Sequence, residues 1–133
     1  MEILGEYKTS TVVIVRVDPG ECIQHTLETF VKDRGGNAMV LSAVGSVSKL
    51  NVANPKSLDK ENLDVAVYEF EGPFELMSLI GGVGPVHAHG KSDSHLHIAV
   101  SRHDGTVLGG GLRYGTEPWF PIQVYLLFQQ EDS

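Results

Sequence analysis

Helical periodicity occurs in one long segment of this chain, and a single helix limits the folds that the rest can adopt. Within residues 21–34 the apolar side chains recur at helical spacing, at Ile23, Leu27, Phe30 and Val31. We expect Asp18 to cap this helix, Pro19 to occupy its first position and Gly35-Gly36 to end it. Most of the hydrophobic core must therefore come from strands.

The other apolar segments are short and rich in β-branched residues, as strands are. They cover residues 11–17, 38–44, 46–53, 65–70, 74–80, 94–102, 106–108 and 123–128. The segment 46–53 is either a separate strand or a continuation of 38–44 beyond a β-bulge. Gly72-Pro73 should break the extended pattern, residues 81–85 should form a flexible turn, and Asp104-Gly105 should form a hairpin turn. The predicted fold class is α+β, a mainly antiparallel sheet of short strands with one principal helix packed on it.

His95 and His97 alternate with aliphatic residues in one of these strands. Because successive side chains of a strand point to opposite faces, the two imidazoles should share one face and the aliphatic side chains the other. The buried face would hold Leu96, Ile98 and Val100. His87 and His89 repeat the spacing just upstream. Paired imidazoles can ligate a metal or transfer protons, so this strand is the predicted site.

Composition predicts one soluble domain over residues 1–133, with a core at about 11–129. Seventeen acidic and ten basic residues give a net charge of −7, which opposes binding to duplex DNA. No apolar run approaches the roughly 18 residues of a membrane span. The first residues lack the pattern of a secretory signal, and Cys22 has no partner for a disulfide within the chain. We therefore expect a cytoplasmic protein.

Several motifs occur in an order that resembles a known family. They are Gly72-Pro73-Phe74-Glu75-Leu76-Met77-Ser78-Leu79, Ser94-His95-Leu96-His97 and Gly109-Gly110, and they follow a strand and a Pro-Gly-Glu helix start. In this order they resemble the plants-and-prokaryotes-conserved (PPC) domain over roughly residues 12–128.

The resemblance implies one main helix on an antiparallel sheet, a homotrimer, and a fold similar to that of acetolactate decarboxylase. Plant members lie beside AT-hook segments, and their Gly-x-Phe-Glu segment contacts partner proteins. Here Gly72, Phe74 and Glu75, within residues 72–77, are the matching positions, although Phe74 is also expected in the core. Many prokaryotic members are labelled as DNA-binding proteins. This chain has no AT-hook core of Arg-Gly-Arg-Pro.

The chain departs from the family pattern at Gly111, where a histidine is usual. In acetolactate decarboxylase a His-x-His pair and a later histidine hold zinc. By that resemblance His95 and His97 would supply two ligands for zinc or another divalent metal. Candidates for a further ligand are His87, His89, His103, Asp93 and Glu75. The alternative is that these histidines only form hydrogen bonds at the surface or between subunits.

Two further segments have structural interpretations. Gly109-Gly110-Gly111 matches no phosphate-binding fingerprint and predicts a close approach of backbones, between strands or at a threefold axis. Trp119 and Phe120, flanked by prolines, predict aromatic packing within or between subunits.

Three functions remain open from the sequence. The leading interpretation is a non-enzymatic homotrimeric regulatory or binding module with a divalent metal held by histidines. The second is a metal-dependent enzyme acting on a small carbonyl compound, with Glu75 or Asp93 moving protons. The third is a DNA-binding protein, as the family labels suggest, which the net acidity disfavours.

Overall fold

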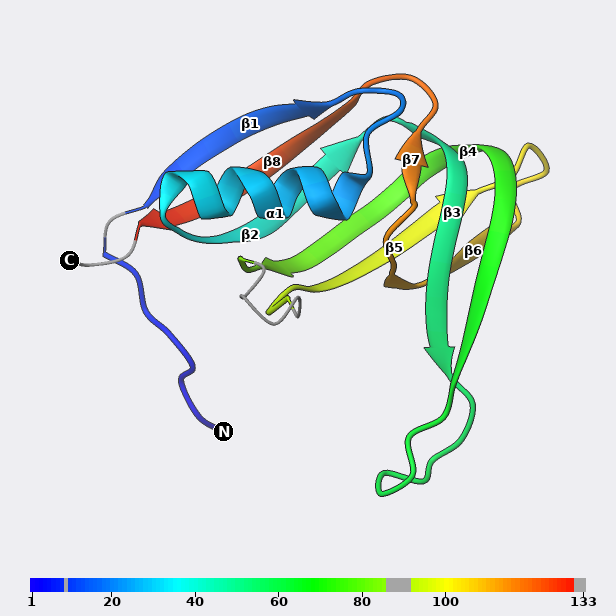
Figure 1. Ribbon diagram of the computed structural model, residues 1–133, viewed down its shortest axis with the longest axis horizontal. Helices are drawn as coiled ribbons and strands as arrows, with labels where there is room; N and C mark the ends of the chain where they lie inside the picture. The colour runs from blue at the N-terminus through cyan, green and yellow to red at the C-terminus, as the bar shows by residue number, and fades with distance from the viewer. Residues whose placement is uncertain (9, 86–91, 131–133) are drawn as a thin grey trace.

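The predicted α+β fold is confirmed, with one helix on a mainly antiparallel sheet (Figure 1). The computed structural model describes residues 1–8, 10–85 and 92–130. Along this part of the chain the elements are β1 (Thr11–Val17), α1 (Ile23–Arg34), β2 (Gly36–Val44), β3 (Ser46–Pro55), β4 (Val65–Val83), β5 (His95–Ser101), β6 (Val107–Leu112), β7 (Glu117–Pro118) and β8 (Ile122–Gln130). β2 and β3 are separate strands that both pair with β4, but β2 also pairs with β8 and β3 with β6 and β7, which decides between the two interpretations of residues 46–53.

The described strands form one sheet in the order β1-β8-β2-β4-β5-β6-β3-β7, and their pairings are antiparallel. β4 also pairs with β3, so β4, β5, β6 and β3 close into a ring of strands. Beyond this ring β3 and β4 continue as a two-stranded arm with residues 56–64 at its tip (Figure 1). The ring holds the predicted histidine strand between β4 and β6.

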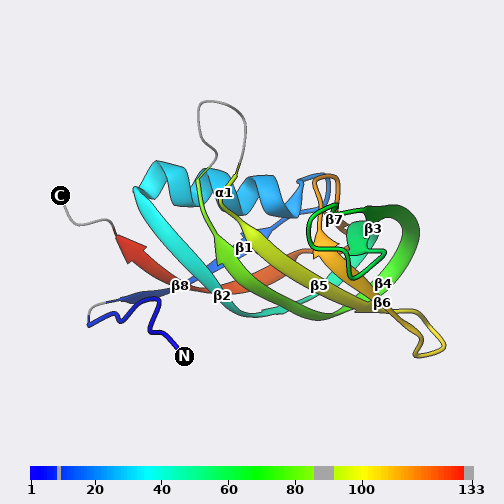
Figure 2. The same ribbon diagram turned by 90° about the horizontal axis from the view of Figure 1, so that it is seen from below.

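α1 covers one face of the sheet (Figure 2), and its apolar stripe is buried except at Phe30, which is partly buried. Ile23, Leu27 and Val31 are 0% exposed. They belong to one core cluster with inward-facing strand residues, among them Val17, Val40, Val124, Leu126 and Phe128. Burial of this apolar surface is the main favourable contribution to folding here.

Among the described residues, no helix has the length and apolar character that crossing a membrane requires.

α1 ends where the sequence predicts but begins later. Gly35 terminates it with a φ of 76°, and its N–H donates to a carbonyl oxygen of the last turn at 3.0 Å. The prediction that Asp18 caps the helix is wrong. Its carbonyl accepts the Glu21 N–H at 3.1 Å in a turn that precedes the helix. The helix starts at Ile23 because the Ile23 N–H donates to the Thr116 carbonyl oxygen at 2.9 Å, a contact distant in sequence.

β4 runs without interruption through Gly72-Pro73, so the predicted break there is wrong. The register against β3 shifts between Val47 and Lys49, and neither Gly72 nor Pro73 has a ladder partner at that point. The missing N–H of proline therefore interrupts no ladder hydrogen bond.

The expected turn at residues 81–85 is also wrong for its first half, because residues 81–83 continue β4. Gly81 pairs with Leu96 of β5 and has a φ of 121°. A Cβ at Gly81 would collide with the His95 carbonyl oxygen. The glycine thus permits close pairing with the histidine strand rather than a change of direction.

Candidate functional site

The alternation of His95 and His97 with buried aliphatic residues is confirmed in β5. Both histidines are exposed, whereas the residues between and after them lie in the core at 4%, 2% and 0% exposure, namely Leu96, Ile98 and Val100. The two imidazole centroids are 5.0 Å apart, with the rings at 79° to each other. Opposite His97 on β4 lies Ile80, which is 51% exposed, so the two imidazoles lie on the side of the sheet away from the core.

The histidines line a cavity of about 490 Å³ at the meeting of β3, β5, β6 and the start of α1. Polar lining residues come from four places in the chain and are Gln24, Asn54, Ser94 and Arg113. The predicted close approach of the glycine segment to other strands is confirmed here. A Cβ at Gly109 would collide with the Ile98 carbonyl oxygen, and one at Gly110 would lie 2.6 Å from the Asn54 side chain. The absence of side chains from these glycines lets β6 lie tightly against β5 and β3.

Gly111 lies directly opposite His97 on β5 and opposite Ala53 on β3. A side chain at this position would therefore start on the same face as the His97 imidazole. A Cβ at Gly111 would lie 3.2 Å from the Ala53 carbonyl oxygen and 3.7 Å from the Nη1 atom of Arg113. The Arg113 guanidinium thus lies beside the position that the family resemblance assigns to a third histidine.

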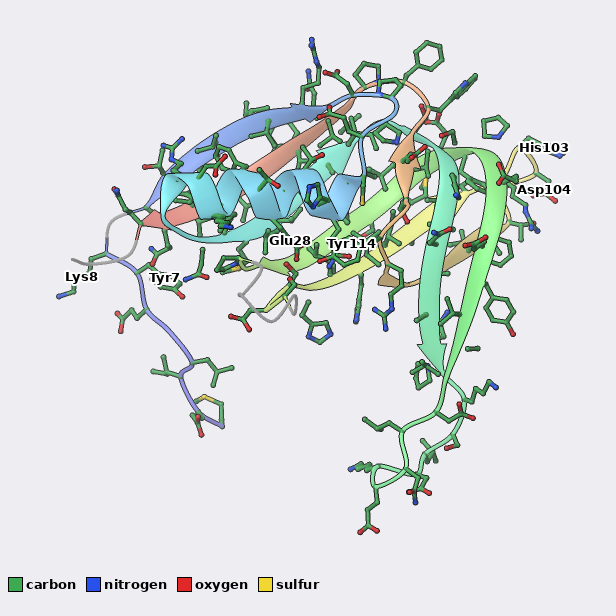
Figure 3. The ribbon with its side chains drawn as sticks, viewed as in Figure 1. Tyr7, Lys8, Glu28, His103, Asp104 and Tyr114 are labelled. Carbon is green, nitrogen blue, oxygen red and sulfur yellow. The ribbon has the colours of Figure 1, made fainter. Side chains whose placement is uncertain are left out.

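The described residues contain no group of three His, Cys, Asp or Glu side chains placed to hold a metal ion. His95 and His97 provide two imidazoles, and zinc sites usually need at least three protein ligands. His87 and His89 lie outside the described residues. His103 lies in the β5–β6 hairpin turn beside Asp104, beyond the opposite end of β5 (Figure 3). The residues that the structure describes therefore do not complete a zinc site by themselves.

Glu75 and Asp93 do not line the histidine cavity. Glu75 is exposed on β4, where it pairs with Ser101 at the far end of β5. Asp93 is exposed and lines a different hollow. In the segment 72–77 Phe74 is buried at 4% exposure, as expected for a core residue. The structure brings none of these side chains to His95 and His97.

A buried carboxylate, which the sequence interpretation missed, supports the cavity wall. Glu28 of α1 is 1% exposed. Its Oε1 accepts a hydrogen bond from the Tyr114 hydroxyl at 2.6 Å, and its Oε2 accepts one from the Ser94 hydroxyl at 2.6 Å. Ser92 also donates to Oε2, and the Gln24 amide does so at 3.4 Å. Figure 3 shows Glu28 and Tyr114 directed toward each other.

The position of Glu28 gave a usable sequence signal. It follows Gln24 by four residues and directly follows Leu27, so it lies at the edge of the buried stripe of α1. Its hydrogen-bond donors could not be recognised from the sequence, because both are far from Glu28 along the chain. Ser94 precedes β5, and Tyr114 follows β6. Glu28 orients both Gln24 and Ser94, two residues of the cavity wall.

Comparison with known proteins identifies sequence relatives. The profile of the Plants and Prokaryotes Conserved domain matches residues 4–128. AT-hook motif nuclear-localized protein 12 of Arabidopsis thaliana is 29% identical over 102 residues, which cover 74% of this chain and 26% of the plant protein. AT-hook motif nuclear-localized protein 14 of the same plant is 30% identical over 113 residues, 85% of this chain and 26% of the relative. The chain thus spans about a quarter of the length of these relatives.

Solved structures share the fold. A metal-containing protein from Archaeoglobus fulgidus superposes with a TM-score of 0.78 at 25% identity, over 100% of this chain and 89% of that one. A plant- and prokaryote-conserved protein from Pyrococcus horikoshii gives 0.76 at 23%, over 98% and 87%. A Bacteroides thetaiotaomicron protein named for DNA binding gives 0.75 at 20%, over 94% and 83%.

The expected similarity to acetolactate decarboxylase is confirmed as a similarity of fold. The Bacillus subtilis enzyme superposes with a TM-score of 0.55 at 13% identity, over 90% of this chain and 52% of the enzyme. A fold similarity of this kind transfers no activity.

We predict that Tyr114 stabilises the fold only while its hydroxyl is protonated. Burial, the hydrogen bond to Glu28 and the negative charge of Glu28 raise the pKa of Tyr114 from 10.0 to about 12. Because this folded-state pKa lies above the unfolded value of about 10, the stabilisation is complete below that pH and is lost as the pH rises toward 12.

The measurement is denaturant unfolding of wild type and Tyr114→Phe across this pH range. The difference in unfolding free energy should be constant below pH 10 and shrink between pH 10 and about 12. The other tyrosines are common to both proteins and cancel in the difference. A difference that stays constant through the whole range would contradict the assignment.

Proposed function

Because the chain belongs to the Plants and Prokaryotes Conserved domain family, we propose that it is a non-enzymatic, homotrimeric binding module of the cytoplasm. The observation that carries this proposal is an exposed apolar surface on the sheet face opposite α1, with Tyr7 of the N-terminal segment beside it. Monomeric soluble proteins rarely expose large contiguous apolar patches, and such patches mark interaction surfaces. The single cysteine of the chain, Cys22, agrees with a reducing compartment.

The apolar surface follows the register of β1, β8 and β2. Val12, Leu127 and Met39 lie in one row across these three strands. Val12 is 59% exposed and Met39 is 43% exposed. The neighbouring residues Ile14 and Leu41 are 61% and 49% exposed. We call these five residues the outer apolar face, and we assign the contact between subunits to it.

Light scattering of the purified protein should therefore give about three monomer masses, and Ile14→Glu should shift the protein to the monomer. Ile14 is largely exposed in the isolated chain, so the substitution has little effect on the subunit itself. In an assembly it would bury an unpaired charge, which is strongly unfavourable.

Val107→Glu is the matched control for this prediction. Val107 is also β-branched, lies on a strand and is 59% exposed, but it belongs to β6 and is outside the outer apolar face. The control should remain trimeric. A wild-type monomer, or dissociation by both substitutions alike, would refute the assigned interface.

We also propose a divalent ion, zinc or a similar metal, at His95 and His97. The support is their common face and their separation of 5.0 Å between ring centroids. Further protein ligands would have to come from His87 or His89, which are neighbours in sequence. The residues of this chain would hold and orient the ion, and the ion would supply a Lewis acid if a carbonyl ligand were bound.

Elemental analysis tests the ion. Replacement of His95 and His97 by alanine should remove stoichiometric zinc, whereas His25→Ala on the exposed side of α1 should not. Gly111→His adds an imidazole on the face of His97, at a position whose φ is not positive, and should raise the zinc content. Equal trace metal in wild type and the double variant would show that the site does not bind zinc.

DNA binding is the second candidate function, and the names of the relatives favour it. The plant relatives are named for an AT-hook motif, and one solved structure is named for DNA binding. The net charge of −7 argues against it, since affinity for DNA depends largely on cationic side chains that neutralise phosphates.

Gel-shift titration of duplex DNA across a series of salt concentrations distinguishes these views. We expect no retardation by the purified chain even at low ionic strength, where electrostatic binding is strongest. Retardation that weakens steadily with added salt would instead establish DNA binding and overturn this expectation.

A further inference from the structure

We propose that the histidine cavity binds a small molecule through an anionic group, a carboxylate or a phosphate, held by Arg113 together with His95 and His97. This inference rests on the proposal that the chain is a binding module, and it names the chemical class of the ligand. It requires neither a bound metal ion nor an enzymatic activity.

The charge of the lining residues is the first observation. Among the described residues, the cavity wall contains one arginine, two histidines and no carboxylate. This composition contrasts with the whole chain, in which acidic residues outnumber basic ones by seventeen to ten. A concave site whose wall carries an unopposed positive charge, here that of Arg113, raises the local concentration of anions.

The free bonding capacity of Arg113 is the second observation. Its side chain is exposed, and the described residues place no carboxylate within ion-pair distance of it. With the described residues, its guanidinium makes one hydrogen bond, from Nη1 to the Leu112 carbonyl oxygen at 3.3 Å. A guanidinium has five N–H donors in a planar fork that matches carboxylate and phosphate oxygens. Most of these donors remain available to a ligand.

The relation of Arg113 to Gly111 is the third observation. The Nη1 atom of the guanidinium lies 3.7 Å from where a Gly111 Cβ would be, an ordinary contact distance, on the face of the His97 imidazole. A permanent positive charge at this position attracts an anion. The imidazole N–H groups of His95 and His97 can add donors on the same face.

The volume of the cavity and the hydrogen bonds behind its wall fit a small organic ligand. A volume of about 490 Å³ is in the range of small-molecule sites. Behind the wall, the Glu28 carboxylate accepts hydrogen bonds from Ser92, Ser94, Tyr114 and Gln24. Its charge is therefore engaged by donors of the protein, and it fixes the wall residues Gln24 and Ser94.

The experiment titrates the full chain, freed of metal on a chelating resin, with inorganic phosphate and separately with malonate at constant ionic strength. Heteronuclear NMR follows the Arg113 guanidinium and the backbone amides of residues 109–113. Saturable shifts of these signals with either anion, without added zinc, are expected, and comparison of the two titrations identifies the preferred group. Chloride at the same ionic strength should cause no saturable shift.

Three variants make the test specific. Arg113→Gln should weaken binding by about tenfold or more, as expected for loss of charge-assisted hydrogen bonds. Arg113→Lys keeps the charge but loses the planar fork, so its affinity should lie between those of wild type and Arg113→Gln. Arg102→Gln removes an equal charge from the β5–β6 hairpin turn and should bind like wild type.

Several outcomes would overturn the inference. These are the absence of saturable binding for both anions, equal affinity in wild type and Arg113→Gln, or binding that needs added zinc. Light scattering of the same samples separates this inference from the proposed assembly. A trimer that binds neither anion refutes the ligand class alone, and a monomer that binds one refutes the trimer alone.

Discussion

The hydrogen bonds to the Glu28 carboxylate connect two parts of this structure, the packed helix and the wall of the cavity. The first part is α1, which packs on the sheet with Ile23, Leu27 and Val31 fully buried. The second part is the cavity. Ser94, which precedes β5, and Tyr114, which follows β6, connect this region to α1 by their hydrogen bonds to Glu28. A buried carboxylate without partners would cost several kcal/mol, whereas one that accepts charge-assisted hydrogen bonds gains about 1.5–3 kcal/mol from each. The helix therefore docks in a position where these donors are available, and that position shapes the cavity.

Close strand pairing then determines which side chains meet. Glycines let β6 lie close to β5 and β3, and in the observed register position 111 lies directly opposite His97. Register is set along the whole strand by the hydrophobic pattern and the turns, and not by position 111 alone. The fold thus presents the Arg113 guanidinium beside the position where the family resemblance places an imidazole. The ligand class is decided by one or two side chains and not by the fold.

Local patterns could be interpreted from the sequence, and contacts distant in the sequence could not. The alternation in β5 and the end of α1 at Gly35 depend on backbone geometry within a few residues, and both are confirmed. The start of α1 depends on a carbonyl oxygen of Thr116, and the passage of β4 through Pro73 depends on a register shift in β3. The same distinction between local patterns and distant contacts holds for the residues of the candidate site. His95 and His97 follow from periodicity, but the place of Arg113 follows only from the pairing of three strands.

Charge distribution links the two exposed surfaces of the molecule. A net charge of −7 keeps separate copies of the chain apart at long range, so association has to come from short-range apolar contact such as the outer apolar face offers. The histidine pair lies on the same side of the sheet, because His95 is opposite Gly82 on β4, and Gly82 is opposite Met39 on β2. Assembly through the outer apolar face would therefore bring other subunits close to the cavity mouth and reduce its exposure to water. In a less polar surrounding each ion pair and hydrogen bond to a bound anion becomes stronger, so assembly and ligand binding should reinforce each other.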